Sequence, residues 1–192
     1  EIEGFYKHLD NLSATNPEID SEDDQFFVND GVGRIYGMEF MARQAPLGKL
    51  FGWLSYTLSR SERNDYPESN PDGWYAYDFD QTHIVVLVAG YRLPWNMEVS
   101  GRFQHVTGNP YTPYTGGVYD MDQDLYFGYS AGDRNSERLP PYTALDLRWS
   151  KRFVFKRGWF ELYADFLNAY RGENPEFVLD NYDYTESRYV RG

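Results

Sequence analysis

The side chains that most often carry out catalysis are few and scattered in this chain. It has three histidines, His8, His83 and His105, and no cysteine. Each histidine falls in a different predicted strand, and none has a serine, aspartate or paired carboxylate placed to complete a catalytic site. The absence of cysteine excludes disulfides, thiolate metal sites and cysteine nucleophiles. We therefore expect that the chain is not an enzyme.

One acidic run has the spacing of a cation-binding loop. Asp120, Asp122 and Asp124 stand at alternate positions, as the first three carboxylate ligands of a calcium loop do. Leu125 occupies the position where such a loop needs glycine, and the closing glutamate is also missing. The preferred interpretation is a solvated acidic loop, with a structural calcium ion as the alternative. No other metal or cofactor is expected.

Aromatic side chains give the segment 109–140 a second candidate role. Its tyrosines include Tyr111, Tyr114, Tyr119, Tyr126 and Tyr129. Their rings could stack on a small solute arriving from solution. They could equally pack on one another and keep the segment ordered, and packing is the preferred interpretation.

The elements that must position these groups are predicted to be β-strands, because apolar and polar residues alternate with period two. Seven strands are predicted, at about 2–12, 27–45, 49–62, 77–93, 97–108, 141–155 and 159–170. On the second strand the even positions 36–42 form the apolar face. Arg34, Glu39 and Arg43 are assigned to the polar face.

The predicted polar faces carry charges of both signs. The residues assigned to them, as the lining of a barrel lumen, are Glu39, Arg43, Glu98, Arg102, Asp146, Arg148, Arg152, Glu161 and Asp165. A two-residue turn at 156–157 would set Arg152 opposite Glu161 and Arg148 opposite Asp165, and opposite charges across a ladder stabilise a sheet. A turn at 157–158 would shift this register by two residues and keep the faces.

Short and long connections alternate along the predicted strands. The tight turns fall at 46–48, 94–96 and 156–158, and the long connections at 13–26, 63–76 and 109–140. Short periplasmic turns and longer extracellular loops are typical of outer-membrane β-barrels. The pattern therefore predicts an all-β, antiparallel, up-and-down transmembrane barrel segment.

Composition agrees with this fold class and excludes another partner. Aromatic residues make up 19% of the chain, yet its mean hydropathy is −0.69. Rings that are only half desolvated suit the aromatic girdles at the two membrane boundaries. The net charge of −12 disfavours nucleic-acid binding, which needs clustered lysine and arginine. The longest apolar run, 84–89, is too short for a membrane-spanning helix.

Several stretches are similar, in order, to one known family. They are GFYKHLDNL, GRIYGMEFMARQ with Gly33, Gly37 and Glu39, HVTGNPYTP, and LDLR with Leu145, Asp146 and Arg148 followed by Asn168 and Asn174. Together they resemble the β-barrel of the TonB-dependent outer-membrane receptors. No single motif is decisive, but the series covers most of the chain.

The resemblance implies more than the residues themselves do. It implies that residues 1–192 are the C-terminal portion of a 22-stranded barrel, with the plug domain and the final strand outside this chain. It implies the outer membrane of a Gram-negative bacterium, and the partners would be the rest of the barrel, the plug, the TonB complex acting through the plug, and lipid. The whole receptor would bind a scarce solute outside the cell and import it.

Two other functions fit parts of the pattern. A soluble or surface-attached β-sheet module that binds carbohydrate would explain the aromatic loops and the acidity. It would not explain apolar faces along so many strands with tight turns at one end. A passive outer-membrane pore or adhesin would share the fold but have no plug.

Overall fold

The computed structural model describes residues 1–16, 26–45, 48–130 and 132–191, and these residues form fourteen β-strands and no helix. In this described part of the chain, no helix is long and apolar enough to cross a membrane. The predicted acidic connection at 13–26 and the turn at 46–48 lie partly outside the described residues. The all-β prediction is confirmed.

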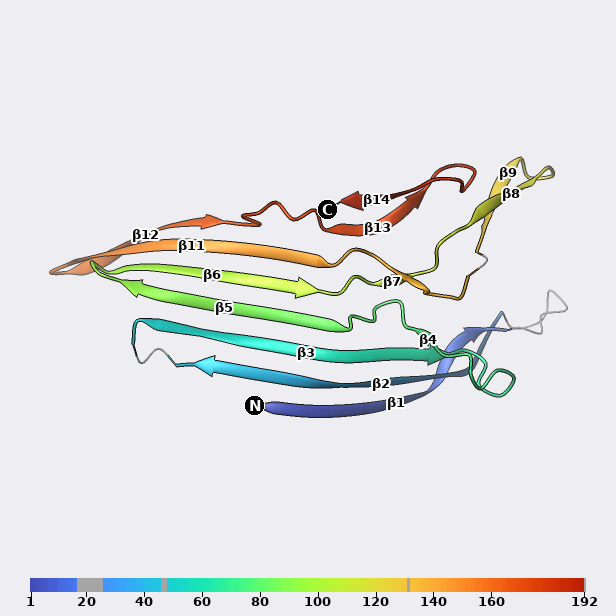
Figure 1. The fold of residues 1–192 in the computed structure, drawn as a ribbon, viewed down its shortest axis with the longest axis horizontal. Coiled ribbons are helices and arrows are strands. Elements are labelled where there is room, and N and C mark those ends of the chain that lie inside the picture. The colour runs from blue at the N-terminus through green and yellow to red at the C-terminus, as the bar shows by residue number, and fades with distance from the viewer. Residues whose placement is uncertain (17–25, 46–47, 131, 192) are drawn as a thin grey trace.

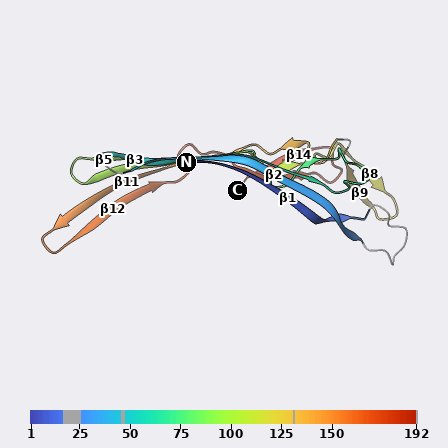
Figure 2. The ribbon, with the colours of Figure 1, turned by 90° about the horizontal axis from the view of Figure 1, so that it is seen from below.

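Seven long strands form one antiparallel sheet in which each strand pairs with the next long strand in the sequence (Figure 1). They are β1 (Ile2–Thr15), β2 (Phe27–Gln44), β3 (Leu50–Asn64), β5 (His83–Leu93), β6 (Met97–Val106), β11 (Tyr142–Phe155) and β12 (Gly158–Phe166). This order is that of an up-and-down barrel wall. Figure 2 shows it from below as a single curved layer.

Seven shorter strands lie towards the end of the sheet away from the tight turns, five in the long connections and two after β12 (Figure 1). They are β4 (Tyr75–Ala76), which pairs with the end of β3, and the pairs β7 (Pro110–Tyr111) with β10 (Glu137–Arg138), β8 (Gly116–Asp120) with β9 (Leu125–Tyr129), and β13 (Pro175–Asp180) with β14 (Ser187–Arg191). The opposite end carries the tight turns, so the predicted alternation of short and long connections is confirmed.

The ladder registers join the apolar positions of successive strands into one continuous face. Leu54 lies opposite Leu87, Leu87 opposite Phe103, and Phe103 opposite Leu145. On the last hairpin Phe155 pairs with Gly158, which confirms the two-residue turn and sets Phe153 opposite Phe160. Their rings stack with centroids 4.8 Å apart. Side chains two residues apart share a face of a strand, so the whole apolar set points one way.

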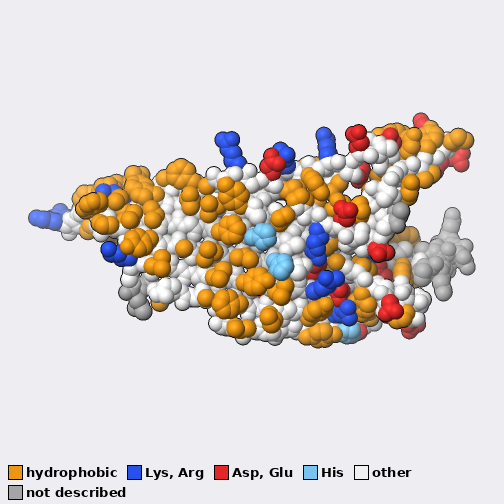
Figure 3. Space-filling model, in the orientation of Figure 1, with side chains coloured by type: hydrophobic (Ala, Val, Ile, Leu, Met, Phe, Trp, Pro, Cys, Tyr) orange, Lys and Arg blue, Asp and Glu red, His pale blue; other side chains and the backbone are white. Residues whose placement is uncertain are grey.

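Burial in this sheet is the reverse of that in a soluble domain. Among the described residues, the only buried hydrophobic side chains are those of Ala14 and Ala144, whereas Glu62, Asn64 and Asp80 are buried. The apolar face leaves large side chains uncovered, with Leu87 at 42% and Leu162 at 52% exposure (Figure 3). Exposing such a large apolar face to water is unfavourable. The sheet therefore fits an apolar medium on that side and polar surroundings on the other.

Several strand boundaries differ from those predicted. β5 begins at His83 rather than at 77, because Asp80 closes a turn by donating its backbone N–H to the carbonyl of Tyr77 at 2.8 Å. β12 ends at Phe166 rather than at 170, and β1 continues to Thr15 through bulges after Leu9. Residues 109–140, predicted to be a loop, contain four short strands, and the β13–β14 hairpin was not predicted.

The assignment of Arg34 to the polar face is also wrong. β2 pairs with β3 without a bulge from Val32 to Gln44, so Arg34 and Tyr36, two residues apart, share a face. Arg34 therefore lies on the apolar side of the sheet, near the end that carries the long connections.

Candidate ligand-binding loops

One buried carboxylate fastens the long connections to the sheet. The side chain of Asp80 is 1% exposed and accepts a hydrogen bond from the backbone N–H of Ser61 at 2.6 Å. Arg138, from β10, forms an ion pair with the same carboxylate and donates to the backbone carbonyl of Asp80 at 2.8 Å. The segment before β5, the strand β3 and the returning arm of the 109–140 connection therefore meet at one side chain.

A second set of contacts joins the same two connections farther out. The amide nitrogen of Asn135 donates to the carbonyl of Ala76 at 2.8 Å and to the carboxylate of Asp78 at 2.6 Å. Arg134 forms an ion pair with Asp65 at 2.6 Å, and Tyr75 donates to the other oxygen of that carboxylate. Burial, followed by this hydrogen bond to Asp65, raises the pKa of Tyr75 well above its ordinary value. These contacts join the connection between β3 and β5 to the connection between β6 and β11. We call the two joined connections the loop platform.

Glycine is required where two arms of this platform cross. A Cβ at Gly108 would lie 1.9 Å from the backbone oxygen of Leu139. Leu139 in turn donates its backbone N–H to the carbonyl of Asn109 at 3.0 Å. At Gly108, in the TGNP stretch of the sequence, two backbone segments therefore pass very close to each other. Any side chain at position 108 would push them apart.

Most of the predicted ligand-facing tyrosines pack against one another or against the connection between β13 and β14. The rings of Tyr119 and Tyr126 lie 5.1 Å apart, and Tyr126 contacts Tyr182 at 5.3 Å. Tyr114 contacts Tyr184 at 4.9 Å. These contacts agree with the packing interpretation for three of the five tyrosines. Tyr129 lies on β9 and remains 49% exposed.

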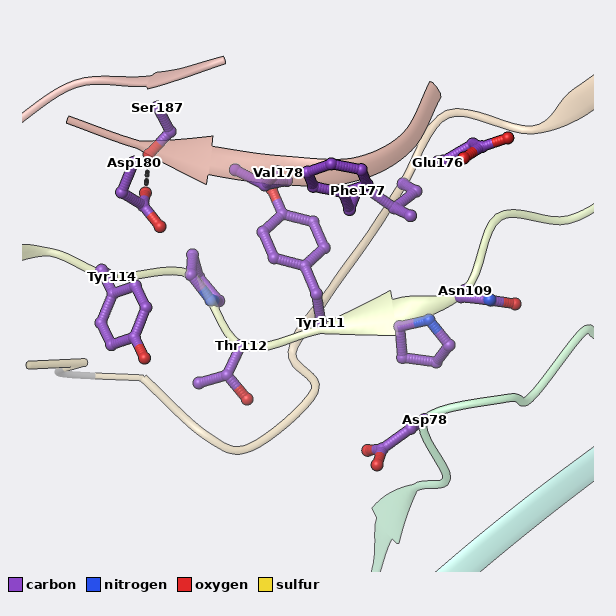
Figure 4. A pocket seen from close by; sticks show the side chains of 13 residues that line it. Asp78, Asn109, Tyr111, Thr112, Tyr114, Glu176, Phe177, Val178, Asp180 and Ser187 are labelled. Carbon is purple, nitrogen blue, oxygen red and sulfur yellow. Dashed lines mark hydrogen bonds between the residues drawn. The ribbon is translucent and has the colours of Figure 1, made fainter. Parts of the chain in front are cut away.

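Tyr111 has a different position, in a cavity of about 360 Å³ between β7 and β13. Its ring points toward Phe177 and Val178, and Asp78 and Glu176 lie on the rim (Figure 4). Burial and a hydrogen bond with Tyr189 raise the pKa of its phenol. Among the described residues that line this cavity there is no lysine, arginine or histidine. The cavity presents aromatic and oxygen-bearing side chains, which suit a polyhydroxylated or cationic solute better than an anion.

The three aspartates of the predicted acidic run lie in and beside the β8–β9 turn, where two of them hold its geometry. Asp120 accepts hydrogen bonds from the backbone N–H groups of Asp122 at 2.8 Å and Gln123 at 3.2 Å. Asp124 accepts from the hydroxyl of Tyr119, which raises the pKa of that phenol. No group of three or more metal-ligating side chains converges within the part of the chain that the structure describes. The calcium alternative stays a prediction.

The nine charged residues assigned to the polar face all lie on the side of the sheet opposite the apolar face. Two predicted pairs are brought together: Arg152 with Glu161 at 2.9 Å and Arg148 with Asp165 at 3.6 Å. Arg102 and Asp146, which were assigned to this face but not predicted to pair, also form an ion pair, at 2.7 Å. Glu98 lies 3.8 Å from Arg92, which the sequence interpretation did not include. Glu39 and Arg43 form no ion pair within the described residues. Their role in lining a lumen stays a prediction.

Charge reversal tests the pairing on this face. Arg152→Glu would place two carboxylates directly across the ladder, and we expect a loss of about 0.5–1 kcal/mol in the free energy of unfolding, because the pair is largely exposed. Adding Glu161→Arg should restore most of that loss. The measurement is urea unfolding of the full-length protein in detergent or vesicles. A double variant no more stable than the single one would contradict the pairing.

The residues that hold the platform together could not be found from the sequence. Asp80 and Arg138 are 58 positions apart, and no local pattern indicates that they meet. The β13–β14 hairpin did carry a signal, since the short apolar run Phe-Val-Leu at 177–179 precedes the turn-forming run NYDYT.

These observations define a class of protein: the wall of a membrane-spanning antiparallel β-barrel, with an ordered loop platform at one end. A family model described as the TonB dependent receptor-like β-barrel matches residues 1–169. The chain belongs to this family, one of outer-membrane receptors and transporters of Gram-negative bacteria that work with a plug domain and a TonB partner. No curated protein and no solved structure matches the chain.

Proposed function

We propose that this chain is part of an active transporter in the outer membrane of a Gram-negative bacterium, which binds a scarce solute outside the cell and imports it with TonB-coupled energy. The observation that carries the proposal is the apolar face over seven strands with the long connections gathered at one end. A soluble carbohydrate-binding module would have to cover such a face, and among the described residues only two alanines are buried apolar side chains.

The chain would supply wall, polar lining and part of the outer loop platform, with no catalytic step of its own. Its partners would be the rest of the barrel, the plug, the TonB complex acting through the plug, and lipid. The platform is the part most suited to meet a solute, because its cavity and exposed rings lie at the end away from the tight turns. The charged pairs of the polar face would orient toward the plug.

Uptake by cells that carry the full-length protein tests this function. Labelled ferric siderophores, cobalamin, oligosaccharides and peptides are offered to energised cells and to cells treated with a protonophore. We expect one class to bind in both states and to accumulate only in energised cells. Deletion of residues 116–129, the β8–β9 hairpin, should weaken binding by at least ten-fold. Accumulation that persists without energy would indicate a passive pore instead.

A further inference from the structure

The cavity that holds Tyr111 is formed by three segments that are far apart in the sequence. Tyr111 comes from β7, in the connection between β6 and β11, and Phe177 comes from β13, after β12. Asp78 comes from the connection between β3 and β5. The cavity has a volume of about 360 Å³, at the small end of the range of about 300–1,000 Å³ that small-molecule sites cover. It therefore suits a small solute, or the end of a longer one.

Two aromatic rings offer apolar surface to this cavity. Phe177 is 48% exposed, although it lines the cavity wall. The ring of Tyr111 points toward Phe177 and Val178 (Figure 4). The phenol of Tyr111 donates a hydrogen bond to Glu137 at 3.2 Å, which holds the ring in one orientation. A ring that is already fixed loses little conformational entropy when it stacks on the C–H face of a sugar ring.

Three carboxylates are spread around these rings. In Figure 4, Asp78 and Asp180 lie on opposite sides of Tyr111. Glu176 lies on another part of the rim. No three metal-ligating side chains converge within the described part of the chain, so these carboxylates do not meet at one point. Because a carboxylate accepts short, strong hydrogen bonds from hydroxyl groups, this arrangement matches a solute with hydroxyls around its edge.

The charges of the lining distinguish between classes of solute. Among the described residues that line the cavity there is no lysine, arginine or histidine, so an anionic solute would face carboxylates alone. Asp78 already accepts a hydrogen bond from Asn135 at 2.6 Å, and it is exposed, so water and salt screen its charge. Asp180 accepts one from Ser187, also at 2.6 Å. One ammonium group could meet only one of these separated carboxylates, whereas several hydroxyls can meet them all.

We propose that the cavity around Tyr111 binds the end of a neutral oligosaccharide. The inference rests on the proposed function and names the class of solute that the receptor takes. The rings of Tyr111 and Phe177 stack on a sugar ring, and the separated carboxylates accept hydrogen bonds from its hydroxyl groups. The positions of those carboxylates select among sugars by the positions of their hydroxyls.

Isothermal titration calorimetry of the purified full-length receptor tests the solute class. The neutral probes are short oligomers of glucan, xylan, mannan and chitin. Oligolysine is the cationic probe, and a ferric catecholate is the anionic one. We expect one neutral oligomer to bind more tightly than either charged probe. Its affinity should change by less than two-fold between low and high salt, because contacts to a neutral solute are little screened.

Substitutions in and beside the cavity locate the site. Phe177→Ala removes a stacking surface and should weaken binding of that oligomer at least ten-fold. Leu179→Ala is the matched control, because Leu179 lies on the same strand, is 42% exposed and does not line the cavity. It should bind within two-fold of the parent. Glu176→Gln should weaken binding only about three-fold, since the amide oxygen still accepts a hydrogen bond from a hydroxyl.

Three results would overturn the proposal: no binding of any neutral oligomer, an equal loss in Phe177→Ala and Leu179→Ala, or tighter binding of oligolysine that falls steeply with salt and in Glu176→Gln. The last would indicate a site for a cationic solute. Import is read separately. Accumulation of another solute class in energised cells, without oligosaccharide binding, rejects only the sugar site. Accumulation of the bound oligosaccharide without energy rejects the proposed function and leaves the sugar site standing.

Discussion

Replacing Asp80 by alanine is expected to lower the free energy of unfolding by about 3 kcal/mol, because it leaves the guanidinium of Arg138 without its ion-pair partner and the N–H of Ser61 without an acceptor. Removing one partner of a buried pair typically costs about 3–5 kcal/mol. The low end applies here, since the side chain of Arg138 is still 29% exposed. Asp80→Asn keeps an acceptor for Ser61 and should cost about half as much.

Unfolding of the full-length receptor in urea measures this effect, and proteolysis of the folded receptor locates it. The matched control is Asp78→Ala. Asp78 is exposed and accepts one hydrogen bond, from Asn135, so we expect a loss of about 0.5–1 kcal/mol. Proteolysis within 109–140 should become faster in Asp80→Ala and not in the control. Equal destabilisation by the two variants would mean that Asp80 does not fasten the platform.

Arginine at position 54 is expected to destabilise the protein by about 2–4 kcal/mol, the cost of a lipid-facing cation near the bilayer midplane. Leu54 lies halfway along the apolar positions of β3, from Leu50 to Leu58, and faces Leu87 and Ala42 across its two ladders. A guanidinium there has no carboxylate opposite it in either ladder and must deform the bilayer or reach its surface.

Thr57→Arg gives the comparison on the polar face. Thr57 lies opposite Glu39, a carboxylate without an ion pair in the described residues, so a new arginine there gains a partner. We expect a change within about 0.5 kcal/mol of the parent. Refolding into vesicles measures both variants. If Leu54→Arg were neutral, or if Thr57→Arg were the costlier change, the two faces would be assigned the wrong way round.

The sequence was sufficient to predict the strands and the faces because both depend on local periodicity. The alternation from Met97 to Phe103 on β6 survives unchanged in the structure, and the turn at 156–157 sets Arg152 opposite Glu161 as predicted. Strand ends were harder to predict. Tyr77 looks like part of a strand, but tertiary contacts of Asp80 form a turn there that alternation cannot reveal.

The loop platform could not be predicted, because it depends on pairs that are distant in sequence. Asn135 reaches Ala76 across 59 positions, and Arg134 reaches Asp65 across 69. The sequence did predict that the tyrosine rings of 109–140 pack against other side chains. It could not indicate that those partners include Tyr182 and Tyr184, beyond the next pair of strands.

Cysteine labelling of intact cells tests the central claim, that this sheet is an outer-membrane wall with its long connections outside. The chain has no cysteine, so single cysteines in the full-length receptor, with any others replaced, give clean positions. An impermeant maleimide should label Asp122→Cys, in the β8–β9 turn, on intact cells, and Lys156→Cys, in a tight turn, only after the outer membrane is opened. Leu54→Cys should stay unlabelled in both. Labelling of Lys156→Cys on intact cells, or of Leu54→Cys by the aqueous reagent, would contradict this topology.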